Sequence, residues 1–435
     1  MQDNEASTTD ATLLLEFMFR LAQAQIACGE QTARIELALR RIASAYGMRK
    51  SRVIIFPTAI FITLHDQEQE RITLAEGPMY GLRLDQIADV YALTRAAENG
   101  ELEPREGIER LSEILRKKAR FGAVGTVAGH AILTLGLAMI LKPSLENLAA
   151  AALLGAIVGG LKLINRDRPV LAVPTPVLAA ALVSTLVFLA LEHGLPVDPA
   201  HMLVPPLVTF LPGAMLTLGM VELAYGEMIS GTSRLISGFV QLVLLAFGLA
   251  AGAMLVGYSP EELVEAARKV TTITWGFWGP WAAVIVFGTG VYVHFSAPQR
   301  SFWWVILVLL VAFTAQQLAA AVFGSEISGF FGMLVATPLG YLIQTRFRGP
   351  PAMVTFLPSF WLVVPGSLGL SSVTHLLSDR TAGIEGLITV IFVITSIALG
   401  TLVGASLYKA VTEHFGSWRL QIGRVGSYVR RAKKD

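Results

Sequence analysis

The chain has 435 residues, of which 54% are hydrophobic and 15% are charged, whereas about 25% are charged in ordinary soluble proteins. This composition excludes an ordinary cytosolic enzyme, a disordered protein and, because Cys28 is the single cysteine, a scaffold held by internal disulfides. A net charge of +2 gives no reason to expect a nucleic-acid partner.

The first quarter of the chain reads as a soluble domain. Residues 1–121 carry 34 charged residues, and the remaining 314 residues carry 32. Residues 1–12 are polar and acidic, without the basic region and apolar core of a signal peptide, so we expect this part to stay in the cytoplasm. Apolar spacing predicts a helix over residues 13–47, with Gly47 as its stop.

A small sheet is predicted in the middle of this domain. Residues 52–64 and 71–75 are rich in β-branched and aromatic side chains, and Pro57 is expected at an edge or a bulge. Helical spacing returns over residues 83–98 and 104–119. A domain of about 120 residues is large enough for a modest core of its own.

Ten stretches in the rest of the chain are apolar and long enough to cross a membrane, which takes about 20 mostly apolar residues. The fourth and the ninth are less regular because they contain prolines: Pro205, Pro206 and Pro212 in the fourth, Pro358 and Pro365 in the ninth. The predicted spans are 122–141, 145–164, 170–191, 203–221, 235–257, 276–296, 302–323, 328–345, 352–371 and 384–408.

The distribution of Lys and Arg near the span ends predicts the orientation. With the N-terminal domain inside, the inner side receives most of these residues, and the outer side receives Lys142, Arg268, Lys269 and Arg380. Such an asymmetry is typical of a multi-pass protein in the inner (plasma) membrane. We expect both termini in the cytoplasm, with residues 410–435 as a basic tail.

An internal repeat relates the two halves of the apolar region. The segment VPPLVTFLPG, which starts at residue 204, matches LPSFWLVVPG at a shift of 153 residues. LAFGLAAGAML, which starts at residue 245, matches IALGTLVGASL in the second half. The second match pairs Gly248 with Gly400 and Gly252 with Gly404.

The predicted fold class is therefore a mainly α membrane protein with ten transmembrane helices in two five-helix units, 122–258 and 276–409, after a small α+β cytosolic domain. An odd number of spans per unit makes the two repeats inverted. Inverted repeats with a broken helix in each half are typical of transporters, because carbonyls freed by proline persist in a membrane only when buried or facing a wet cavity. Matched prolines in both repeats favour this interpretation over simple helix kinks.

Motifs of other protein classes are missing from the sequence. It contains no GxxxxGK[ST] loop, no HExxH and no CxxC, so we expect neither a cofactor nor a metal. Uphill transport would then draw on an ion or proton gradient. His65 and Asp66 are adjacent in a polar turn, which is more typical of a solvated loop than of a catalytic pair.

Three segments resemble the threonine/serine exporter (ThrE) family. CGEQTARIELALRRIASAYG, residues 28–47, is similar to its opening pattern, and PGAMLTLGMVELAYGEMISGTSRL, residues 212–235, to its first-half signature. PSFWLVVPGSLGL, residues 358–370, resembles the second-half signature. The resemblance covers nearly the whole chain and implies ten spans, a cytosolic N-terminal domain and export of threonine and serine driven by the proton-motive force. The residues that match the opening pattern are Gly29, Thr32, Arg34, Ile35 and Glu36.

The sequence also departs from the family pattern. Glu222 and Glu227 stand where the family often has Asp, which bears on proton affinity and reach. Family members vary in substrate, and some two-protein versions are linked to dicarboxylate export. Threonine as the substrate is therefore implied by the family resemblance and is not inferred from the residues of a binding pocket.

Eight residues around the two breaks are candidates for substrate binding. A half-helix N-terminus offers donors to the carboxylate of an amino acid, and freed carbonyls accept from its ammonium group. Glycine lets a ligand approach the backbone. The alternative is that Ser and Thr hydroxyls bond to carbonyls of their own helix. The candidates are Thr209, Pro212, Gly213 and Thr217 at the first break, and Pro365, Gly366, Ser367 and Ser371 at the second.

Four titratable residues are candidates for proton coupling, because carboxyl and imidazole groups near the membrane interior can carry protons. For Glu222 the alternative is an interfacial ion pair with Arg234. For His130 it is a neutral imidazole bonded to Thr126 or Thr134, which share its helix face. The candidates are Glu222, Glu227, His130 and His375, the last being the repeat counterpart of Glu222.

The leading hypothesis is a secondary active exporter of threonine and serine that works by alternating access, with the amino acid, protons and the lipid bilayer as its partners. A second hypothesis is a transporter whose substrate is a small dicarboxylic acid such as succinate. A third reading is a membrane-anchored enzyme or sensor acting through the N-terminal domain. That domain's task stays open among gating the inner mouth, sensing substrate and stabilising a homo-oligomer.

Overall fold

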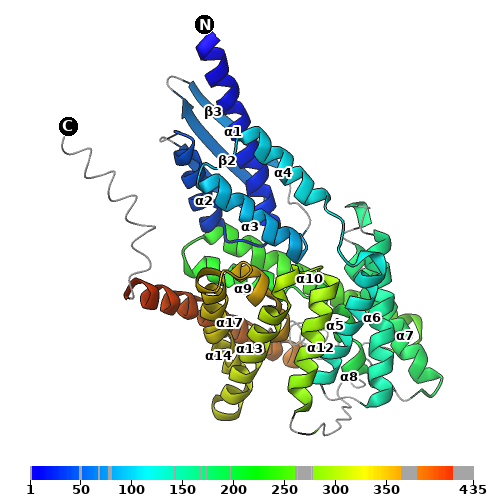
Figure 1. Ribbon diagram of the computed structural model, residues 1–435. Coiled ribbons are helices and arrows are strands. Elements are labelled where there is room, and N and C mark those ends of the chain that lie inside the picture. The colour runs from blue at the N-terminus through cyan, green and yellow to red at the C-terminus, as the bar shows by residue number, and fades with distance from the viewer. Residues whose placement is uncertain are drawn as a thin grey trace.

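The computed structural model is mainly helical, with a small N-terminal domain at one end of a helical bundle (Figure 1). The bundle carries long apolar helices, and the domain carries the sheet. The structure describes residues 2–48, 51–66, 69–76, 81–141, 144–165, 169–171, 174–195, 197–259, 262, 276, 278–363 and 380–414.

The N-terminal domain combines four helices with a three-stranded antiparallel sheet in the order β1-β2-β3. Its apolar spacing is that expected from the sequence, since Phe17, Leu21, Ile35 and Leu39 are all fully buried. These side chains form a common core with the inner face of the sheet. The elements are α1 (Gln2–Ala27), α2 (Thr32–Ala45), β1 (Ser51–Ile55), β2 (Ala59–Asp66), β3 (Gln69–Glu76), α3 (Leu84–Glu98) and α4 (Pro104–Arg116).

Two details of the predicted domain are wrong. The single helix expected over 13–47 is two helices, because Gly29 adopts a φ of +77° between them, a conformation that favours glycine. The segment 52–64, predicted as part of a small sheet, holds strands β1 and β2. Pro57 lies in the tight turn between them, where Phe56 and Ala59 exchange backbone hydrogen bonds, and not at a bulge.

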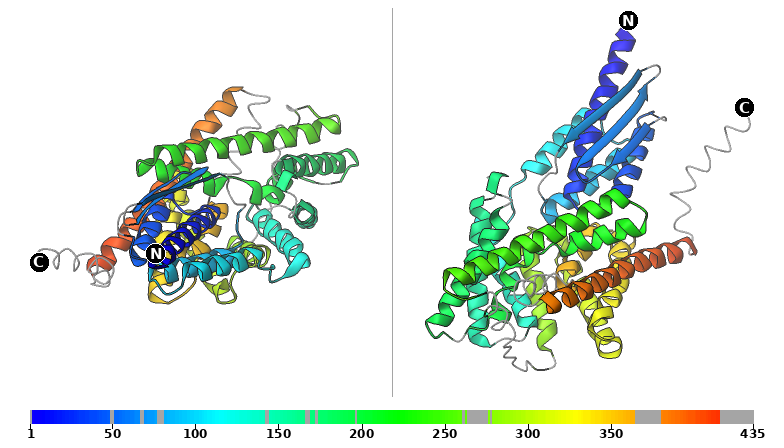
Figure 2. Two further views of the ribbon diagram at one scale, coloured as in Figure 1. Left: turned by 90° about the horizontal axis from the view of Figure 1, so that it is seen from above. Right: turned by 180° about the vertical axis from the view of Figure 1, so that it is seen from behind.

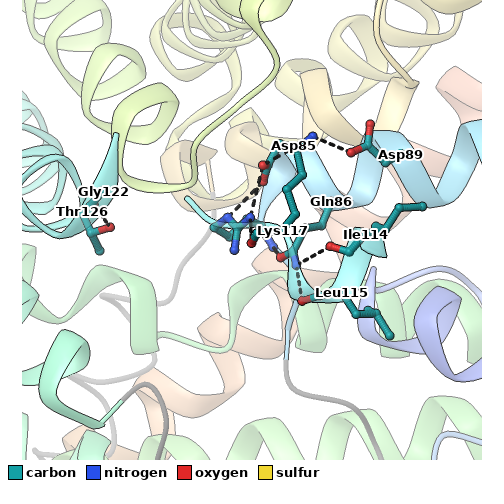
Figure 3. A network of polar contacts seen from close by, with 9 residues as sticks. Asp85, Gln86, Asp89, Ile114, Leu115, Lys117, Gly122 and Thr126 are labelled. Carbon is teal, nitrogen blue, oxygen red and sulfur yellow. Dashed lines mark hydrogen bonds and ion pairs between the residues drawn. The ribbon is translucent and has the colours of Figure 1, made fainter. Parts of the chain in front are cut away.

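A polar network fastens the end of this domain to the chain that leads into the bundle (Figure 3). Gln86 on α3 donates to the carbonyls of Ile114 and Leu115 at the end of α4, at 3.0 and 3.1 Å. Lys117 forms an ion pair of 2.6 Å with Asp89. These bonds occupy carbonyls that the end of α4 leaves without helical partners.

Within the described residues, seven helices are long and apolar enough to cross a membrane, and each coincides with a predicted span. The chain is therefore a multi-pass membrane protein by length and composition of its helices. The helices are α5 (Gly122–Ile140), α6 (Leu145–Asn165), α7 (Pro174–Glu192), α10 (Met228–Leu255), α13 (Phe302–Phe323), α14 (Ser325–Arg346) and α17 (Arg380–His414).

The other three predicted spans are shorter or interrupted. The fourth consists of the 3₁₀ helix η2 (Pro205–Phe210) and the helix α9 (Gly213–Ala224), and the sixth is α12 (Gly279–His294). The ninth begins as α15 (Ala352–Val363), which continues through Pro358. Pro358 therefore does not interrupt this helix, and the break predicted at Pro365 and Gly366 lies outside the described residues. Short helical turns complete the bundle: η1 (Pro169–Leu171), α8 (Pro199–Met202) and η3 (Gln299–Ser301).

Helices α5 and α12 pack backbone against backbone. A Cβ added at Gly136 would lie 2.2 Å from the backbone nitrogen of Phe287, and one added at Gly290 would lie 2.2 Å from that of Leu133. Residue numbers rise on α5 as they fall on α12, so the two helices are antiparallel. The two contacts are related by a shift of 154 residues, since Gly290 lies 154 positions after Gly136 and Phe287 lies 154 positions after Leu133. The glycine of each helix therefore meets the equivalent position of the other helix.

The pairs α7–α10 and α14–α17 use one packing scheme. A Cβ added at Gly248 on α10 would lie 2.5 Å from the Val177 carbonyl oxygen on α7. A Cβ added at Gly400 on α17 would lie 2.2 Å from the Phe330 carbonyl oxygen on α14. The residues of the two pairs differ by 152 or 153 positions, the shift found in the sequence.

Candidate functional site

The first helix break lies between η2 and α9 and follows directly from its prolines. Pro205 and Pro206 open η2, and they supply no backbone donor that would continue an α-helix. Leu211 is extended, and Pro212 is the N-cap of α9, whose first residue is the buried Gly213. The chain therefore changes direction within the bundle at Thr209 to Pro212.

Thr209 stands at the centre of a buried polar cluster that four elements build. Its Oγ1 lies 3.1 Å from Nε2 of His130 on α5 and accepts a hydrogen bond of 3.1 Å from Nζ of Lys162 on α6. Lys162 Nζ also lies 3.1 Å from Nε2 of His294 on α12. The His130 and His294 rings meet edge to face, 4.9 Å apart between centroids.

The partners fix the direction of every hydrogen bond in this central cluster. Nδ1 of His130 faces the Gly155 carbonyl at 3.0 Å, and Nδ1 of His294 faces the Thr126 carbonyl at 2.8 Å. Because a carbonyl can only accept, each Nδ1 donates and each Nε2 accepts in the neutral ring. Lys162 therefore donates two hydrogen bonds. One goes to Thr209 Oγ1, whose hydroxyl donates in turn to Nε2 of His130, and the other goes to Nε2 of His294.

The central cluster is buried and has one cationic side chain. His130 is 0% and His294 5% exposed, and Lys162 is half-buried. Among the residues that the structure describes, no Asp or Glu forms an ion pair with Lys162. The rings of Phe210 and Phe295 lie 5.4 and 5.8 Å from its Nζ. Such a site can accept an anion, because its ammonium group has aromatic faces and neutral acceptors around it but no carboxylate partner in the described parts of the chain.

The other candidates of the first break lie on α9. Thr217 is fully buried, and its Oγ1 has no hydrogen-bond partner within the described part of the chain. Pro212 and Gly213 form the beginning of the helix. No hydrogen bond joins Thr217 to the central cluster, so among the predicted site residues that the structure describes, the cluster brings together Thr209 and His130.

Glu222 connects the end of α9 to the N-terminal domain. Its Oε1 accepts from the backbone N–H of Thr32 at 3.1 Å, and its Oε2 pairs with Nε of Arg234 at 2.9 Å. Arg234 on α10 also donates to the Glu30 carbonyl at 2.9 Å, and α10 crosses the bundle beneath the domain in the view from behind (Figure 2). The predicted alternative of an ion pair with Arg234 is thus present, and proton coupling through Glu222 stays a prediction.

The remaining candidates stand apart from both groups or cannot be placed. Glu227 is the N-cap of α10, and its carbonyl accepts from the Gly231 backbone N–H. The described residues contain no group of three or more His, Cys, Asp or Glu that could hold a metal. Five predicted residues of the second break lie outside the described residues: Pro365, Gly366, Ser367, Ser371 and His375.

Sequence reasoning missed Lys162 and His294. Both are ionisable residues within predicted spans, and such residues are functional candidates by default. That signal was present, but Lys162 lies near a span end, where it reads as an orientation signal, and His294 has no patterned neighbour in sequence. Their partners come from helices up to 168 residues away, as for His294 and Thr126.

Comparison with known proteins gives one family. The profile of the threonine/serine exporter family, ThrE, matches residues 16–256 of the chain. A curated Mycobacterium tuberculosis protein named "Probable threonine/serine exporter" is 24% identical over 440 residues, covering 96% of this chain and 79% of that protein. No solved structure gives a significant match.

Proposed function

Because the chain belongs to the threonine/serine exporter family, ThrE, we propose that it is a secondary active transporter exporting threonine and serine across the inner membrane by alternating access, driven by the proton-motive force. Family membership makes the chain a transporter and not an enzyme. The observation that carries the proposal is the central cluster of His130, Lys162, Thr209 and His294 at the first helix break.

Lys162 and Thr209 are the groups that would take the substrate carboxylate. The ammonium group of Lys162 has no acidic partner among the described residues, and an incoming carboxylate would supply one. Thr209 adds a hydroxyl at the point where the helix is interrupted and the backbone is accessible to a ligand. The freed carbonyls of the break would accept from the substrate ammonium group.

The two imidazoles would carry the coupled proton. A proton taken up on Nε2 of His294 would occupy the acceptor that Lys162 uses and would make the ring cationic. A cationic ring repels the ammonium group of the substrate, so the proton and the substrate occupy the site in turn. Release of the substrate and uptake of the proton on the outer side, followed by release of the proton on the inner side, would exchange one for the other.

The architecture proposed is ten spans in two inverted five-helix repeats. The exchanged contacts of α5 and α12 support it, since Gly136 meets Phe287 as Gly290 meets Leu133, across antiparallel helices. The common packing of α7–α10 and α14–α17 supports it independently. Repeats related in this way can rock against each other about a fixed site, which is the motion that alternating access needs.

The proposal includes orientation and partners. We place both termini and the basic tail in the cytoplasm because Lys and Arg are concentrated on that side of the predicted spans. The partners are threonine or serine, protons and the lipid bilayer, without a nucleic acid. Homo-oligomer formation by the N-terminal domain belongs to the same proposal as a hypothesis for its role.

Export of a small dicarboxylic acid such as succinate is the second candidate. One observation favours it: the central cluster offers a cation to an anionic group, while none of its four side chains is a carboxylate for the ammonium group of an amino acid. The two substrates therefore need to be compared directly in one assay.

Reconstitution in lipid vesicles tests the proposal. We expect counterflow of labelled threonine and serine, increased by an inward-directed pH gradient, and little counterflow of succinate. Lys162→Met should lower flux at least tenfold and Thr209→Val several-fold. Thr289→Val is the matched control because Thr289 Oγ1 bonds to the Ile285 carbonyl of its own helix, at 2.8 Å.

Three results would overturn the proposal in different ways. Absence of saturable flux for every amino and dicarboxylic acid would refute transport of this class. Preferential flux of succinate would replace the substrate. Equal flux in Lys162→Met, Thr289→Val and the unchanged protein would remove the central cluster from the transport path.

A further inference from the structure

A polar cavity lies where the N-terminal domain meets the bundle, and none of the four residues of the central cluster lines it. Its volume is about 100 Å³, several times the roughly 10–15 Å³ that one water molecule needs. It therefore has room for a small organic molecule. Helices α9, α14, α15 and α17 line it from the bundle, and the chain around Glu30, Arg34 and Tyr91 lines it from the domain.

The cavity presents one acidic and one basic side chain that are not paired with each other. Glu30 is 8% exposed, and Arg34 is exposed toward the cavity that it lines. Within the described residues no ion pair joins the two. Opposite charges held apart on one wall are the arrangement that a zwitterion requires.

Neutral neighbours hold both charged groups in place. The Tyr91 hydroxyl donates to the Glu30 carboxylate, and the Arg34 guanidinium donates to the Tyr341 hydroxyl. Burial and the neighbouring Glu30 raise the pKa of Tyr91 well above its ordinary value, so this phenol stays a donor. Each charged group is thereby oriented by a tyrosine hydroxyl, and neither forms an ion pair with another described residue.

The part of the wall that the bundle contributes carries a hydroxyl without a hydrogen-bond partner among the described residues. Thr337 on α14 is 1% exposed, and its Oγ1 has no hydrogen-bond partner in the part of the chain that is described. Leu218 and Met353 make the nearby wall apolar. A buried hydroxyl without a partner costs free energy, which a ligand hydroxyl would recover.

We propose that this inner cavity binds a small zwitterionic hydroxy amino acid on the cytoplasmic side, with its ammonium group on Glu30, its carboxylate on Arg34 and its hydroxyl on Thr337. The inference rests on the proposed function for the identity of the amino acid and for the side of the membrane on which the cavity opens. Because the walls come from both the domain and the bundle, an occupied cavity holds the domain against α9 and α14. The N-terminal domain thus senses its substrate at the inner mouth.

Binding to the full-length protein in detergent tests this inference, with isothermal titration of L-threonine as the readout. We expect Glu30→Gln and Arg34→Met each to weaken binding at least tenfold, while Lys162→Met retains a site of unchanged affinity. Arg41→Met and Glu98→Gln are matched controls, since that pair, 3.5 Å apart, lies on the domain surface away from the cavity.

Ligand analogues test the zwitterion directly. Threoninol lacks the carboxylate and 3-hydroxybutyrate lacks the ammonium group, so each should bind at least tenfold more weakly than threonine. Thr337→Val should reduce the preference for threonine over its isostere valine several-fold and leave valine binding unchanged. This milder variant keeps the test valid if Glu30→Gln lowers the folded fraction, which the melting temperature reports.

The outcomes separate this inference from the transport proposal. Wild-type affinity in both Glu30→Gln and Arg34→Met would overturn the cavity site, as would a single binding event that disappears in Lys162→Met. Binding that depends on Glu30 and Arg34 in a protein without threonine flux would leave the cavity site standing and refute the transport function.

Discussion

Substituting Gly136 by alanine tests the close contact between α5 and α12. The new Cβ would lie 2.2 Å from the Phe287 backbone nitrogen, whereas real Cβ contacts keep at least 3.0 Å. The obstacle is backbone, which cannot rotate away, so the helices have to separate by about 0.8 Å, the difference between these distances. The same separation applies to Gly290→Ala, where Leu133 is the obstacle.

The cost follows from three contributions. Alanine stabilises a helix interior by about 0.5–1 kcal/mol relative to glycine, while overpacking costs about 1–3 kcal/mol. A separation of about 0.8 Å would also stretch the 2.8 Å bond between His294 Nδ1 and the Thr126 carbonyl beyond hydrogen-bond range, which costs about 1 kcal/mol. We expect a net destabilisation of about 1–3 kcal/mol, together with a displaced central cluster.

Gly160→Ala is the matched control, since a Cβ at Gly160 on α6 would meet nothing within 4 Å. We expect this variant to be as stable as the unchanged protein or slightly more stable, and to transport normally. Thermal unfolding in detergent and threonine counterflow in vesicles measure both properties. Wild-type stability and flux in Gly136→Ala and Gly290→Ala would refute the packing argument.

Two further predictions concern the join between the domain and the bundle. Glu222→Gln should lower proton-driven flux several-fold more than Glu326→Gln, because Glu222 is buried and paired with Arg234 whereas Glu326 is exposed. Equal flux of the two variants under a pH gradient would refute proton coupling through Glu222. Burial and the nearby Glu30 raise the pKa of the Cys28 thiol well above its ordinary value, so alkylation by iodoacetamide at pH 8 should be at least tenfold slower in the folded protein than in denaturant. Since the pKa of the thiol is higher in the folded state, the protonated thiol contributes to the free energy of unfolding fully below the unfolded pKa of about 8.5, and this contribution is lost as pH rises above that value. Equally fast alkylation of the folded and the denatured protein would contradict the burial of Cys28.

Much of the fold could be predicted because membrane helices are encoded by local apolar length. Seven predicted spans are long apolar helices in the structure. Boundaries set by single backbone conformations were less accessible, as the division of 13–47 at Gly29 illustrates. Pro358 lies inside α15, which accommodates it and continues to Val363. Proline alone does not distinguish a kink from an interruption.

The central cluster was only partly predictable for a different reason. Thr209 and His130 stood out, one beside patterned prolines and the other in the middle of a span. Lys162 and His294 become candidate site residues only once α6 and α12 are seen to pack around η2. No residue spacing in the sequence predicts that packing. The inner cavity was equally hidden, since Arg34 was singled out through the family pattern and its partner Tyr341 lies 307 residues later.

The backbone contact between α5 and α12 limits how the molecule can move. Helices held apart by long side chains can shift by exchanging rotamers, but two helices that touch through glycine have no such slack. We therefore expect α5 and α12 to move together as one rigid unit. The pairs α7–α10 and α14–α17, each held by close glycine contacts, would then rotate as rigid bodies relative to that unit. The central cluster beside α5 and α12 would become accessible from each side of the membrane in turn.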